Sequence, residues 1–448
     1  MRGVRQTEGD MHRGFPKKGR PYEEVLAEVR MLNAGGLVER AARFSAISMK
    51  GRPEAQKLGQ EAFNEFYAHN AVYSPVIPSL GKIEDDLIGY VVDILRGGRE
   101  GRANVTAGGT DSIYCALHAM REWGKANKTG GAAPLKVIVP YSGHAAFGRG
   151  CHYFGLERVK APLRDDYRVD LEAVKNLVDE HTIGIVGSAP SFPYGRYDDI
   201  RALGEVALEH NLWLHVDACL GGFMAPFVRL AGYPVPEFDF TVPGVCSISA
   251  DLHKYGHAPK GISTVSWRSE AYQRHHYVLF DDWAEGAYFS QSMLGSRAAS
   301  PAVAAWAILT HLGEEGKVEI ARDAMRFKER FEGEIDALPN AAVFDTDLTP
   351  LAFTVDHDPE SFLGGMLQKG WYLMGHMRPP LFQVILDSYP EELADELIGD
   401  IKEVLAALAR GEDFPRVGLG YTFTEGGEDA LAGLPLWVQR AIPLMKKI

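Results

Sequence analysis

The sequence predicts an α/β protein with a mainly parallel sheet that is covered by helices. Short apolar runs typical of buried strands occur at 136–139, 183–188 and 213–216, and helical patterns occur at 111–126 and 200–210. This alternation is typical of parallel sheets, because each parallel strand needs a crossover connection to the next one. A chain of 448 residues is also long enough for a large core and two or three packed units.

Further elements are predicted on both sides of this region. Apolar residues recur at helical spacing over 22–32, 59–67 and 83–95, and a proline-broken stretch at 70–78 separates the last two helices. A short strand at 104–107 leads into the central region. The predicted C-terminal elements are a helix from Ser300 through Leu312, a charged helix over 315–338, strands at 341–344, 351–355 and 381–386, and a closing helix over 391–410.

These elements predict three parts. We expect an N-terminal segment over residues 1–58, a large domain over 59–305 that holds the main sheet, and a smaller C-terminal α/β domain over 306–448.

Composition excludes several classes of protein. The chain has 60 acidic and 47 basic residues, a formal charge of −13, which disfavours nucleic-acid binding. No run approaches the roughly 18 apolar residues that a membrane span needs, and the basic start has no apolar core of a signal peptide. The four cysteines show no CxxC spacing, so we expect no metal site. These features predict a cytoplasmic enzyme.

One lysine and one aspartate carry the most information. The stretch 213–216 is predicted to be a buried strand that ends in Asp217, and 249–256 is predicted to be another strand that delivers Lys254. An aldehyde cofactor held as a Schiff base by a lysine, with an acid on its ring nitrogen, is the arrangement expected for pyridoxal 5'-phosphate (PLP). A buried Asp217 needs a positive partner, which a protonated pyridine nitrogen or a structural salt bridge provides.

A glycine-rich turn is a candidate phosphate site. Gly108, Gly109 and Thr110 lie between a predicted strand and a predicted helix, followed by Ser112. Glycines let the backbone approach an anion, and the start of the following helix offers N–H groups and a positive dipole end. An ordinary turn with an N-cap is the alternative interpretation, which the order of Asp217 and Lys254 disfavours.

Two histidines are further candidates. His144 follows a predicted strand at the edge of the sheet where ligands bind, where an imidazole can stack on a flat ring and exchange protons. A loop histidine that caps a helix is the alternative. His253, beside Lys254, is a candidate for contacting the phosphate or moving protons.

Two other features complete the candidate site. Lys260 is a second cation close in sequence to Lys254, and a neighbouring ammonium is expected to disfavour protonation of Lys254; a surface position is the alternative. Gly295 and Ser296 precede a predicted helix and offer another anion-binding terminus, which could reach a phosphate across a subunit boundary.

Together these motifs resemble the sphingosine-1-phosphate lyase family. The resemblance covers about residues 15 to 420. The matching stretches are A-G-G-T-D-S at 107–112, H-A-A-F at 144–147, S-A-P-S-F-P-Y-G at 188–195, H-V-D-A-C-L-G-G-F at 215–223, S-I-S-A-D-L-H-K-Y-G at 247–256 and G-S-R at 295–297.

This resemblance implies a fold, a cofactor and an assembly. The family has the fold-type-I PLP-dependent transferase fold, with a mainly parallel seven-stranded sheet, and is related to the group II amino-acid decarboxylases. The resemblance implies that Lys254 holds the PLP as a Schiff base, that Asp217 contacts its ring nitrogen and that His144 stacks on the ring. It places Gly109 and Thr110 on the cofactor phosphate. Family members are homodimers with shared active sites.

The resemblance also assigns residues outside this group. It implies that Ser296 serves the neighbouring subunit's phosphate and that Lys260 lies on the substrate side. Three departures concern the substrate: Ser48 replaces a tyrosine, Tyr73 near Asn70 replaces a histidine, and Arg378 replaces an aromatic residue before Pro379-Pro380. An arginine binds carboxylate or phosphate in a bidentate fork, so Arg378 is a candidate for an acidic substrate, with a surface arginine as the alternative.

Three functions follow as hypotheses. The first is a carbon–carbon lyase that cleaves a 2-amino-3-hydroxy substrate, with or without a phosphate group, to an amine and an aldehyde. The second is a PLP-dependent amino-acid decarboxylase, which Arg378 and Tyr73 favour and Lys260 opposes. The third, a catalytically inactive protein of the same fold, is disfavoured by the intact set around Lys254.

Overall fold

The computed structural model describes residues 15–16, 18–34, 49, 51–128, 133–371, 373–387 and 391–418. The chain divides into two units, Met1–Phe44 and Ser45–Ile448. Helix α1 (Tyr22–Ala34) belongs to the first unit and agrees with the predicted helix over 22–32. All other described elements belong to the second unit.

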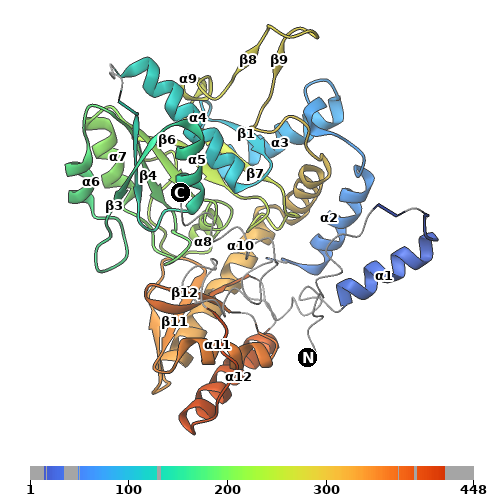
Figure 1. The fold of residues 1–448 in the computed structure, drawn as a ribbon, viewed down its shortest axis with the longest axis vertical. Coiled ribbons are helices and arrows are strands. Elements are labelled where there is room, and N and C mark those ends of the chain that lie inside the picture. The colour runs from blue at the N-terminus through green and yellow to red at the C-terminus, as the bar shows by residue number, and fades with distance from the viewer. Residues whose placement is uncertain are drawn as a thin grey trace. The chain divides into compact units, whose positions relative to one another are not determined.

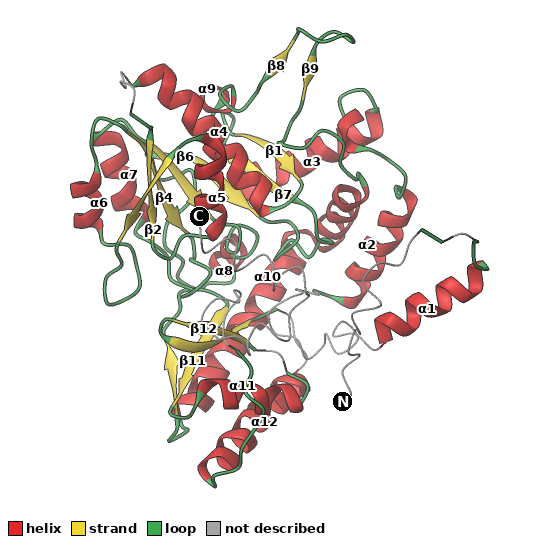
Figure 2. Ribbon diagram, viewed as in Figure 1, coloured by secondary structure: helices red, strands yellow, loops and turns green. Residues whose placement is uncertain are grey.

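The main sheet has seven strands in the order β1-β7-β6-β5-β4-β2-β3 (Figure 2). Its strands are β1 (Arg102–Thr106), β2 (Lys136–Pro140), β3 (Glu157–Ala161), β4 (Thr182–Ser188), β5 (Trp213–Asp217), β6 (Val245–Ala250) and β7 (Ser263–Trp267). The pairs from β3 to β6 are parallel, whereas β7 runs antiparallel to both β6 and β1. The predicted mainly parallel seven-stranded sheet is therefore confirmed.

Both faces of this sheet are buried, which explains the uninterrupted apolar runs of its strands. Successive strand residues point to opposite faces. In β2, Val137 and Val139 join a hydrophobic cluster with residues of α4, whereas Ile138 joins a cluster with residues of α7.

Helices pack on the main sheet, and a second, smaller sheet lies to one side of it with α11 and α12 (Figure 1). The helices are α2 (Pro53–Glu65), the short 3-10 helix η3 (Ala71–Tyr73), α3 (Pro78–Ile94), α4 (Gly109–Asn127), α5 (Ala145–Phe154), α6 (Leu171–Leu177), α7 (Ile200–Glu209), α8 (Ala225–Leu230), α9 (Glu270–Gln273), α10 (Ser300–Asp336), α11 (Pro359–Gln368) and α12 (Glu391–Ala409). A two-stranded hairpin joins β8 (Leu279–Phe280) to β9 (Tyr288–Phe289).

The second sheet is antiparallel, with the order β10-β11-β13-β12. Its strands are β10 (Ala341–Phe344), β11 (Pro350–Val355), β12 (Met374–Met377) and β13 (Pro380–Ile385). Three of them were predicted; β12 was not, because its sequence Met-Gly-His-Met has no alternation of apolar and polar residues. Helix α10 has a backbone break at Gly313 (φ 59°), between the two helices predicted there. The predicted boundary at 305/306 falls inside α10, and the division into domains stays a prediction.

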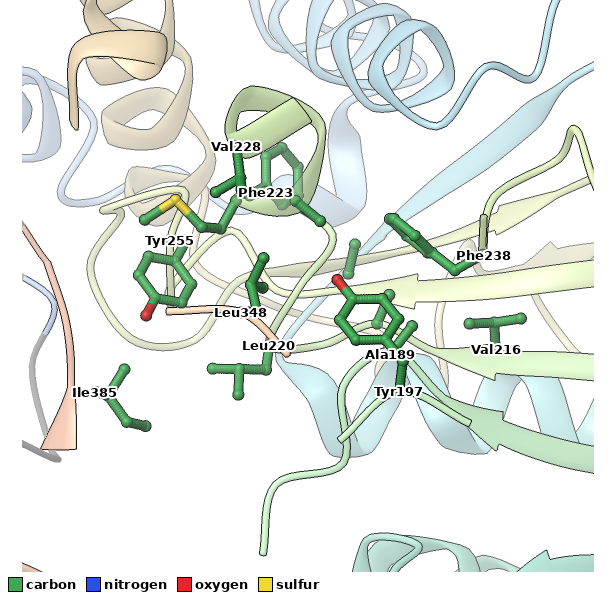
Figure 3. Packing of buried hydrophobic residues seen from close by; sticks show 14 of the residues in the cluster. Ala189, Tyr197, Val216, Leu220, Phe223, Val228, Phe238, Tyr255, Leu348 and Ile385 are labelled. Atoms are coloured by element: carbon green, nitrogen blue, oxygen red, sulfur yellow. The ribbon is translucent and has the colours of Figure 1, made fainter. Parts of the chain in front are cut away.

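The second sheet shares one hydrophobic cluster with the main sheet (Figure 3). Val216 of β5 belongs to the same cluster as Leu348, which precedes β11, and Ile385 of β13. Tyr255, from the loop after β6, lies among them and is fully buried. The loop that carries Lys254 is therefore packed against the second sheet.

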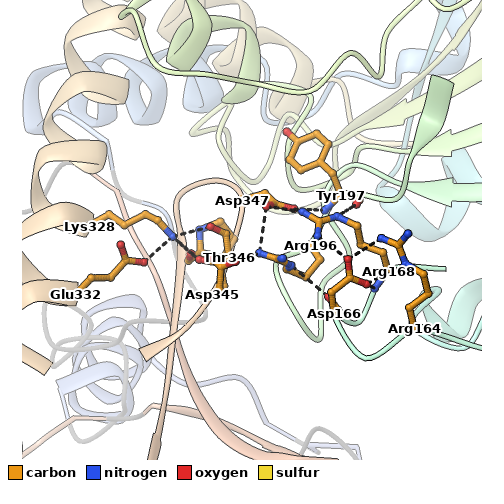
Figure 4. A network of polar contacts seen from close by, with 11 residues as sticks. Arg164, Asp166, Arg168, Arg196, Tyr197, Lys328, Glu332, Asp345, Thr346 and Asp347 are labelled. Carbon is orange, nitrogen blue, oxygen red and sulfur yellow. Dashed lines mark hydrogen bonds and ion pairs between the residues drawn. The ribbon is translucent and has the colours of Figure 1, made fainter. Parts of the chain in front are cut away.

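Ion pairs reinforce this junction (Figure 4). Asp347, in the loop between β10 and β11, accepts hydrogen bonds from Arg168 at 2.7 and 2.8 Å and from Arg196 at 3.2 Å. It also accepts from the backbone N–H of Tyr197 at 2.8 Å. Planar guanidinium groups favour such paired contacts with a carboxylate, so the second sheet is held to the loops of the main sheet at a defined position.

No helix among the described residues is long and apolar enough to cross a membrane.

Candidate active site

The candidate site lies where five strands of the main sheet end. Loops that follow β1, β2, β4, β5 and β6 surround a cavity of about 480 Å³, a volume typical of small-molecule sites. The carboxyl ends of parallel strands share one edge of a sheet, which is why residues far apart in the sequence meet there. The cavity is lined by Ala107, Gly108, Gly109, Thr110, Asp111, Ile113, Tyr114, His144, Pro190, Phe192, Asp217, Cys219, Leu220, Asp251, His253, Lys254, Met293 and Leu294.

Lys254 lies in a turn after β6 and not on a strand, which corrects the sequence prediction. Strand β6 ends at Ala250, where Thr264 of β7 is its partner, and the chain then turns. The N–H of Lys254 donates to the carbonyl of Asp251 at 3.3 Å. The carbonyl of Lys254 accepts from the N–H of His257 at 2.9 Å. The turn gives the lysine a fixed starting point from which its amine reaches the cavity.

Asp251 is the main partner of Lys254, and the sequence interpretation did not select it. Its carboxylate is 2% exposed and lies 3.1 Å from Lys254 Nζ, and Ser263 Oγ donates to it at 2.5 Å. Burial by itself raises the pKa of this carboxyl, but the Lys254 charge and the hydrogen bond from His253 outweigh burial and hold it well below its usual range. Its position three residues before Lys254 in the same motif was an available signal.

The pKa of Lys254 is raised, opposite to the expectation from Lys260. Burial favours the neutral amine, but the negative charge of Asp251 outweighs it, with smaller effects of Cys219 and Asp217 in the same direction. The expected effect of a neighbouring ammonium falls instead on Lys260, whose pKa is lowered by desolvation of its ammonium and by the Lys254 charge.

Asp217 is the last residue of β5 and faces the cavity, as the sequence predicted. Its side chain is 8% exposed, and one of its oxygens accepts from the N–H of Cys219 at 3.1 Å. Ser188 of β4 and Ser249 of β6 are its neighbours in the sheet. The carboxylate is thus held at the floor of the cavity by the sheet itself.

The glycine turn after β1 forms another wall. Gly108 has a φ of 138°, which side-chain-bearing residues rarely adopt, and it caps α4. A Cβ on Gly109 would lie 2.8 Å from both carboxylate oxygens of Asp251. Asp111 fixes the turn, because its carboxylate accepts from the N–H groups of Ala107 at 2.8 Å and Met293 at 3.1 Å. The N-terminal end of α4 and Thr110 therefore open onto the cavity.

His144 has the capping role of the alternative interpretation and also lines the cavity. It is the N-cap of α5, and its Nδ1 accepts from the N–H of Ala146 at 3.2 Å. Because Nδ1 accepts, the neutral ring carries its proton on Nε2. The cap, which is the alternative interpretation, is confirmed, and it orients an imidazole at the cavity; stacking on a ring and proton exchange stay predictions.

His253 lines the cavity beside Lys254, and Lys260 is attached to the backbone of His253. His253 Nε2 lies 3.4 Å from Asp251, and its buried Nδ1 has no hydrogen-bond partner within the described part of the chain. Lys260 Nζ donates to the His253 carbonyl at 2.8 Å. Lys260 is not among the residues that line the cavity.

Gly295, Ser296 and Asn70 are brought together away from the cavity lining. Asn70 Nδ2 donates to Ser296 Oγ at 2.9 Å, and Asn70 Oδ1 accepts from the N–H groups of Val72 and Arg297 at 3.0 and 3.1 Å. The Asn70 amide thus ties the segment before α10 to η3. Tyr73, which ends η3, is 55% exposed, and Ser48 lies outside the described residues.

Arg378 lies at a second cavity, of about 760 Å³, which shares no lining residue with the first. Both cavities use the same two loops, since Tyr141 and Tyr194 line the second and His144 and Phe192 line the first. The backbone carbonyl of Arg378 accepts from the Tyr194 hydroxyl at 2.8 Å. The structure therefore places Arg378 beside the candidate site and not among its lining residues.

Comparisons with known proteins agree with this geometry. Residues 69–355 match the family model for the pyridoxal-dependent decarboxylase conserved domain. Sphingosine-1-phosphate lyase 1 of Mus musculus is 33% identical over 421 residues, which are 93% of this chain and 73% of the mouse protein. The structure of a sphingosine-1-phosphate lyase from Burkholderia pseudomallei has a TM-score of 0.83 and 34% identity, and covers 89% of this chain and 95% of that one.

The chain belongs to the sphingosine-1-phosphate lyase family.

The wider family also contains decarboxylases. The probable L-aspartate decarboxylase of Pyrococcus abyssi is 32% identical over 391 residues, which are 87% of this chain and 99% of that protein. Family membership establishes the fold-type-I fold, the PLP cofactor and a PLP-dependent lyase.

The residues that line the cavity fit PLP. Lys254 supplies an amine, and Asp217 supplies a buried carboxylate that accepts from the N–H of Cys219. The turn at Gly108 and Gly109 gives an approach to the start of α4 that no side chain blocks. Helix starts and glycine-rich turns bind phosphate because unpaired N–H groups point at the anion. The unpartnered Nδ1 of His253 is a further polar group at this wall.

Gly109→Ala is expected to weaken PLP binding by about tenfold or more. The added Cβ would lie 2.8 Å from the Asp251 carboxylate, so that carboxylate must move away from Gly109. The ion pair of Asp251 with Lys254, at 3.1 Å, is then disturbed. Absorbance titration of the protein with PLP measures the effect. Gly89→Ala is the matched control, because Gly89 lies in α3 with nothing within 4 Å of an added Cβ. Equal affinity of the two variants would contradict the prediction.

Proposed function

We propose that this protein cleaves the Cα–Cβ bond of a phosphorylated 2-amino-3-hydroxy substrate, releasing an amine and an aldehyde, as a sphingosine-1-phosphate lyase. The observation that carries the proposal is that Lys254, Asp217 and the Gly109 turn line one cavity in a chain that matches mouse sphingosine-1-phosphate lyase 1 over 93% of its length. With sphingosine 1-phosphate as substrate, the products are phosphoethanolamine and a long-chain aldehyde.

Three groups of this chain serve the cofactor in the proposal. When bound, PLP supplies an electron sink for the electron pair of a bond broken at Cα. Lys254 binds the cofactor covalently through its amine, and Asp251 orients that amine. Asp217 holds a proton on the pyridine nitrogen, since a buried carboxylate favours a positive partner. Gly108, Gly109 and Thr110 bind the phosphate.

The histidines and the second lysine are proposed to act around this centre. His144, fixed by its cap on α5, lies over the ring and carries a proton on Nε2. His253 donates to Asp251 or to the phosphate through the ring nitrogens that face them. Lys260, whose pKa is lowered, is a proton acceptor on the substrate side, held by the His253 carbonyl. Proton transfer by such groups contributes roughly 10²–10⁴-fold to enzymatic rates.

The proposed substrate residues are Asn70, Tyr73 and Arg378. The Asn70 side chain also donates to Ser296, in the segment before α10. A substrate contact of Asn70 would therefore lie next to that segment. Arg378 belongs to the second cavity, which is consistent with contact to a remote part of a long substrate and not to the reacting atoms.

A product assay separates cleavage from decarboxylation. Purified protein loaded with PLP is incubated with sphingosine 1-phosphate, and phosphoethanolamine and aldehyde are measured by mass spectrometry. L-Aspartate and other amino acids are tested in parallel for CO₂ release, because the Pyrococcus abyssi relative is a probable L-aspartate decarboxylase. Aldehyde release that disappears in Lys254→Ala supports the proposal. CO₂ release without aldehyde establishes the alternative, a PLP-dependent amino-acid decarboxylase.

We further propose a homodimer with shared active sites, with Gly295 and Ser296 on the partner's cofactor phosphate. We propose that the β8–β9 hairpin contacts a second copy of this chain. The hairpin exposes three large apolar side chains, Leu279 (66%), Phe280 (61%) and Trp283 (52%), and exposed apolar patches commonly mark protein–protein interfaces. The segment after the hairpin lines the cavity through Met293 and Leu294, so a dimer formed there borders the site.

Light scattering on the purified protein tests the dimer. A mass of twice 49.3 kDa that falls to the single-chain value in Phe280→Asp supports it. A wild-type protein that remains a monomer at micromolar concentration contradicts it. We also propose a cytoplasmic location, which is consistent with four buried cysteines that form no disulfide.

A further inference from the structure

A buried lysine outside the cavity contacts the turn that carries Lys254. Lys317, in α10, is 1% exposed and donates a short hydrogen bond through Nζ to the backbone carbonyl of Tyr255, the residue after Lys254. The same Nζ lies 3.4 Å from Nδ1 of His257 and 5.3 Å from the centre of the Phe227 ring. A lysine is rarely buried this completely without a specific partner, because removing an ammonium group from water costs free energy that hydrogen bonds and charges must offset.

The chain of contacts continues from His257 to the second sheet. His257 Nε2 lies 3.0 Å from the carboxylate of Asp387, which follows β13. With its Nδ1 facing Lys317 and its Nε2 facing Asp387, a neutral imidazole accepts from the ammonium and donates to the carboxylate. The charges of Lys317 and Asp387 are thereby connected through one ring, and all three side chains are at most 3% exposed.

His257 also has an unusual backbone conformation, which its contacts hold in place. Its φ is 60°, a left-handed value that is uncommon for residues other than glycine. Its N–H donates to the carbonyl of Lys254 at 2.9 Å, and its carbonyl accepts from Gln56 Nε2 at 2.9 Å. Gly51 packs on the ring, since a Cβ there would lie 2.9 Å from His257 Cγ, and its N–H donates to Asp387 at 2.8 Å.

Lys317 has different charged and polar neighbours on its two sides. On the side of the Lys254 turn it meets His257 and Asp387; on its other side, it borders a cavity of about 270 Å³ that Asp93, Glu314 and Tyr90 also line. Burial lowers the pKa of Lys317 to about 7, against the opposing effect of Asp387, and burial with the Lys317 charge lowers the pKa of His257. The imidazole is therefore neutral at pH 7, whereas Lys317 is mostly charged only below that pH, so the complete hydrogen-bond chain is favoured on the acidic side of neutrality.

We propose that Lys317, His257 and Asp387 form a buried clamp that fixes the Lys254 turn against the second sheet and so positions the Lys254 amine in the cofactor cavity. The clamp attaches the turn at two points next to the reactive lysine, the carbonyl of Tyr255 and the side chain of His257. Its residues are positioning residues, since none of them lines the cofactor cavity. The proposal rests on the role of Lys254 in PLP binding but not on the identity of the substrate.

Lys317→Met tests the clamp, because methionine fills a similar volume and removes the donor. Hydrogen exchange of the PLP-loaded protein is expected to become about tenfold faster at residues 252–260 while α4 keeps its protection. The pH midpoint of the absorption band of bound PLP is expected to shift, because the Lys254 amine moves relative to Asp251. Lys328→Met is the matched control: Lys328 is a buried lysine of the same helix, but it donates to the carbonyls of Thr346 and Pro350.

Two outcomes overturn the clamp. One is unchanged exchange at 252–260 together with an unchanged absorption midpoint in Lys317→Met. The other is an equal effect of Lys317→Met and Lys328→Met, which shows a general loosening of α10. If Lys317→Met does not fold, Asp387→Asn decides the matter through the same two measurements, since it keeps the shape and removes the charge. Failure of sphingosine 1-phosphate as substrate leaves both measurements readable, so the two proposals fail independently.

Discussion

Lys254→Ala is expected to abolish the visible absorption band of bound PLP and to lower turnover on the order of a thousandfold or more. Lys254 is the one lysine among the described residues that line the candidate cavity, so its loss removes the amine proposed to bind the cofactor covalently. Absorbance spectra of protein purified with excess PLP, and a product assay under saturating PLP, measure the two effects.

Lys160→Ala is the control for this experiment. Lys160 lines the second cavity, and its side chain makes no ion pair or hydrogen bond among the described residues, so its loss is expected to leave the band intact. Lys254→Ala also leaves Asp251 buried without its closest cation, and thermal unfolding separates that loss of stability from the loss of the cofactor. A band that persists in Lys254→Ala, or wild-type protein that stays colourless with added PLP, contradicts the assignment.

Asp217→Asn is expected to lower turnover by about a thousandfold while the protein still folds and binds PLP. An asparagine oxygen can keep the hydrogen bond from the N–H of Cys219, so the end of β5 is preserved. What is lost is the negative charge proposed to hold a proton on the pyridine nitrogen, and a neutral ring is a weaker electron sink. Steady-state kinetics and the PLP content of the purified variant measure the change.

Asp217→Glu is the comparison variant, because it separates the loss of the charge from a change in side-chain length. Glutamate keeps the charge but lengthens the side chain in a site that is 8% exposed, so it is expected to perturb folding and binding more than Asn does, and chemistry less. If Asp217→Asn retains turnover within tenfold of the wild type, the carboxylate is structural and the assignment of the ring-nitrogen partner is wrong.

Local sequence patterns determined the main sheet and many of the residues that line the candidate cavity. The apolar runs at β2, β4 and β5 are continuous because both faces of the sheet are buried, and such runs are readable without a structure. Asp217 could be predicted at the cavity because it ends one of these runs. The glycine turn could be predicted because its residues lie between a strand and a helix.

Other features have no local signature. Strand β12 lacks alternation, and its pairing with β13 alone gives it a strand conformation. The turn that carries Lys254 was predicted as part of a strand; the backbone hydrogen bonds from Lys254 to Asp251 and from His257 to Lys254 make it a turn.

The sequence by itself therefore determined the fold class, the family and the cofactor, because these depend on periodicity and on short motifs that residues close in the chain carry. Only the tertiary structure decided which charges meet. In the folded chain the Asp251 carboxylate lies next to the Lys254 amine, and Arg378 lines a neighbouring cavity. Lys317 contacts His257, which contacts Asp387, 130 residues further along the chain. Pair energies depend on distance and burial, which a linear sequence does not contain, and so the electrostatics of the site is a property of the folded chain.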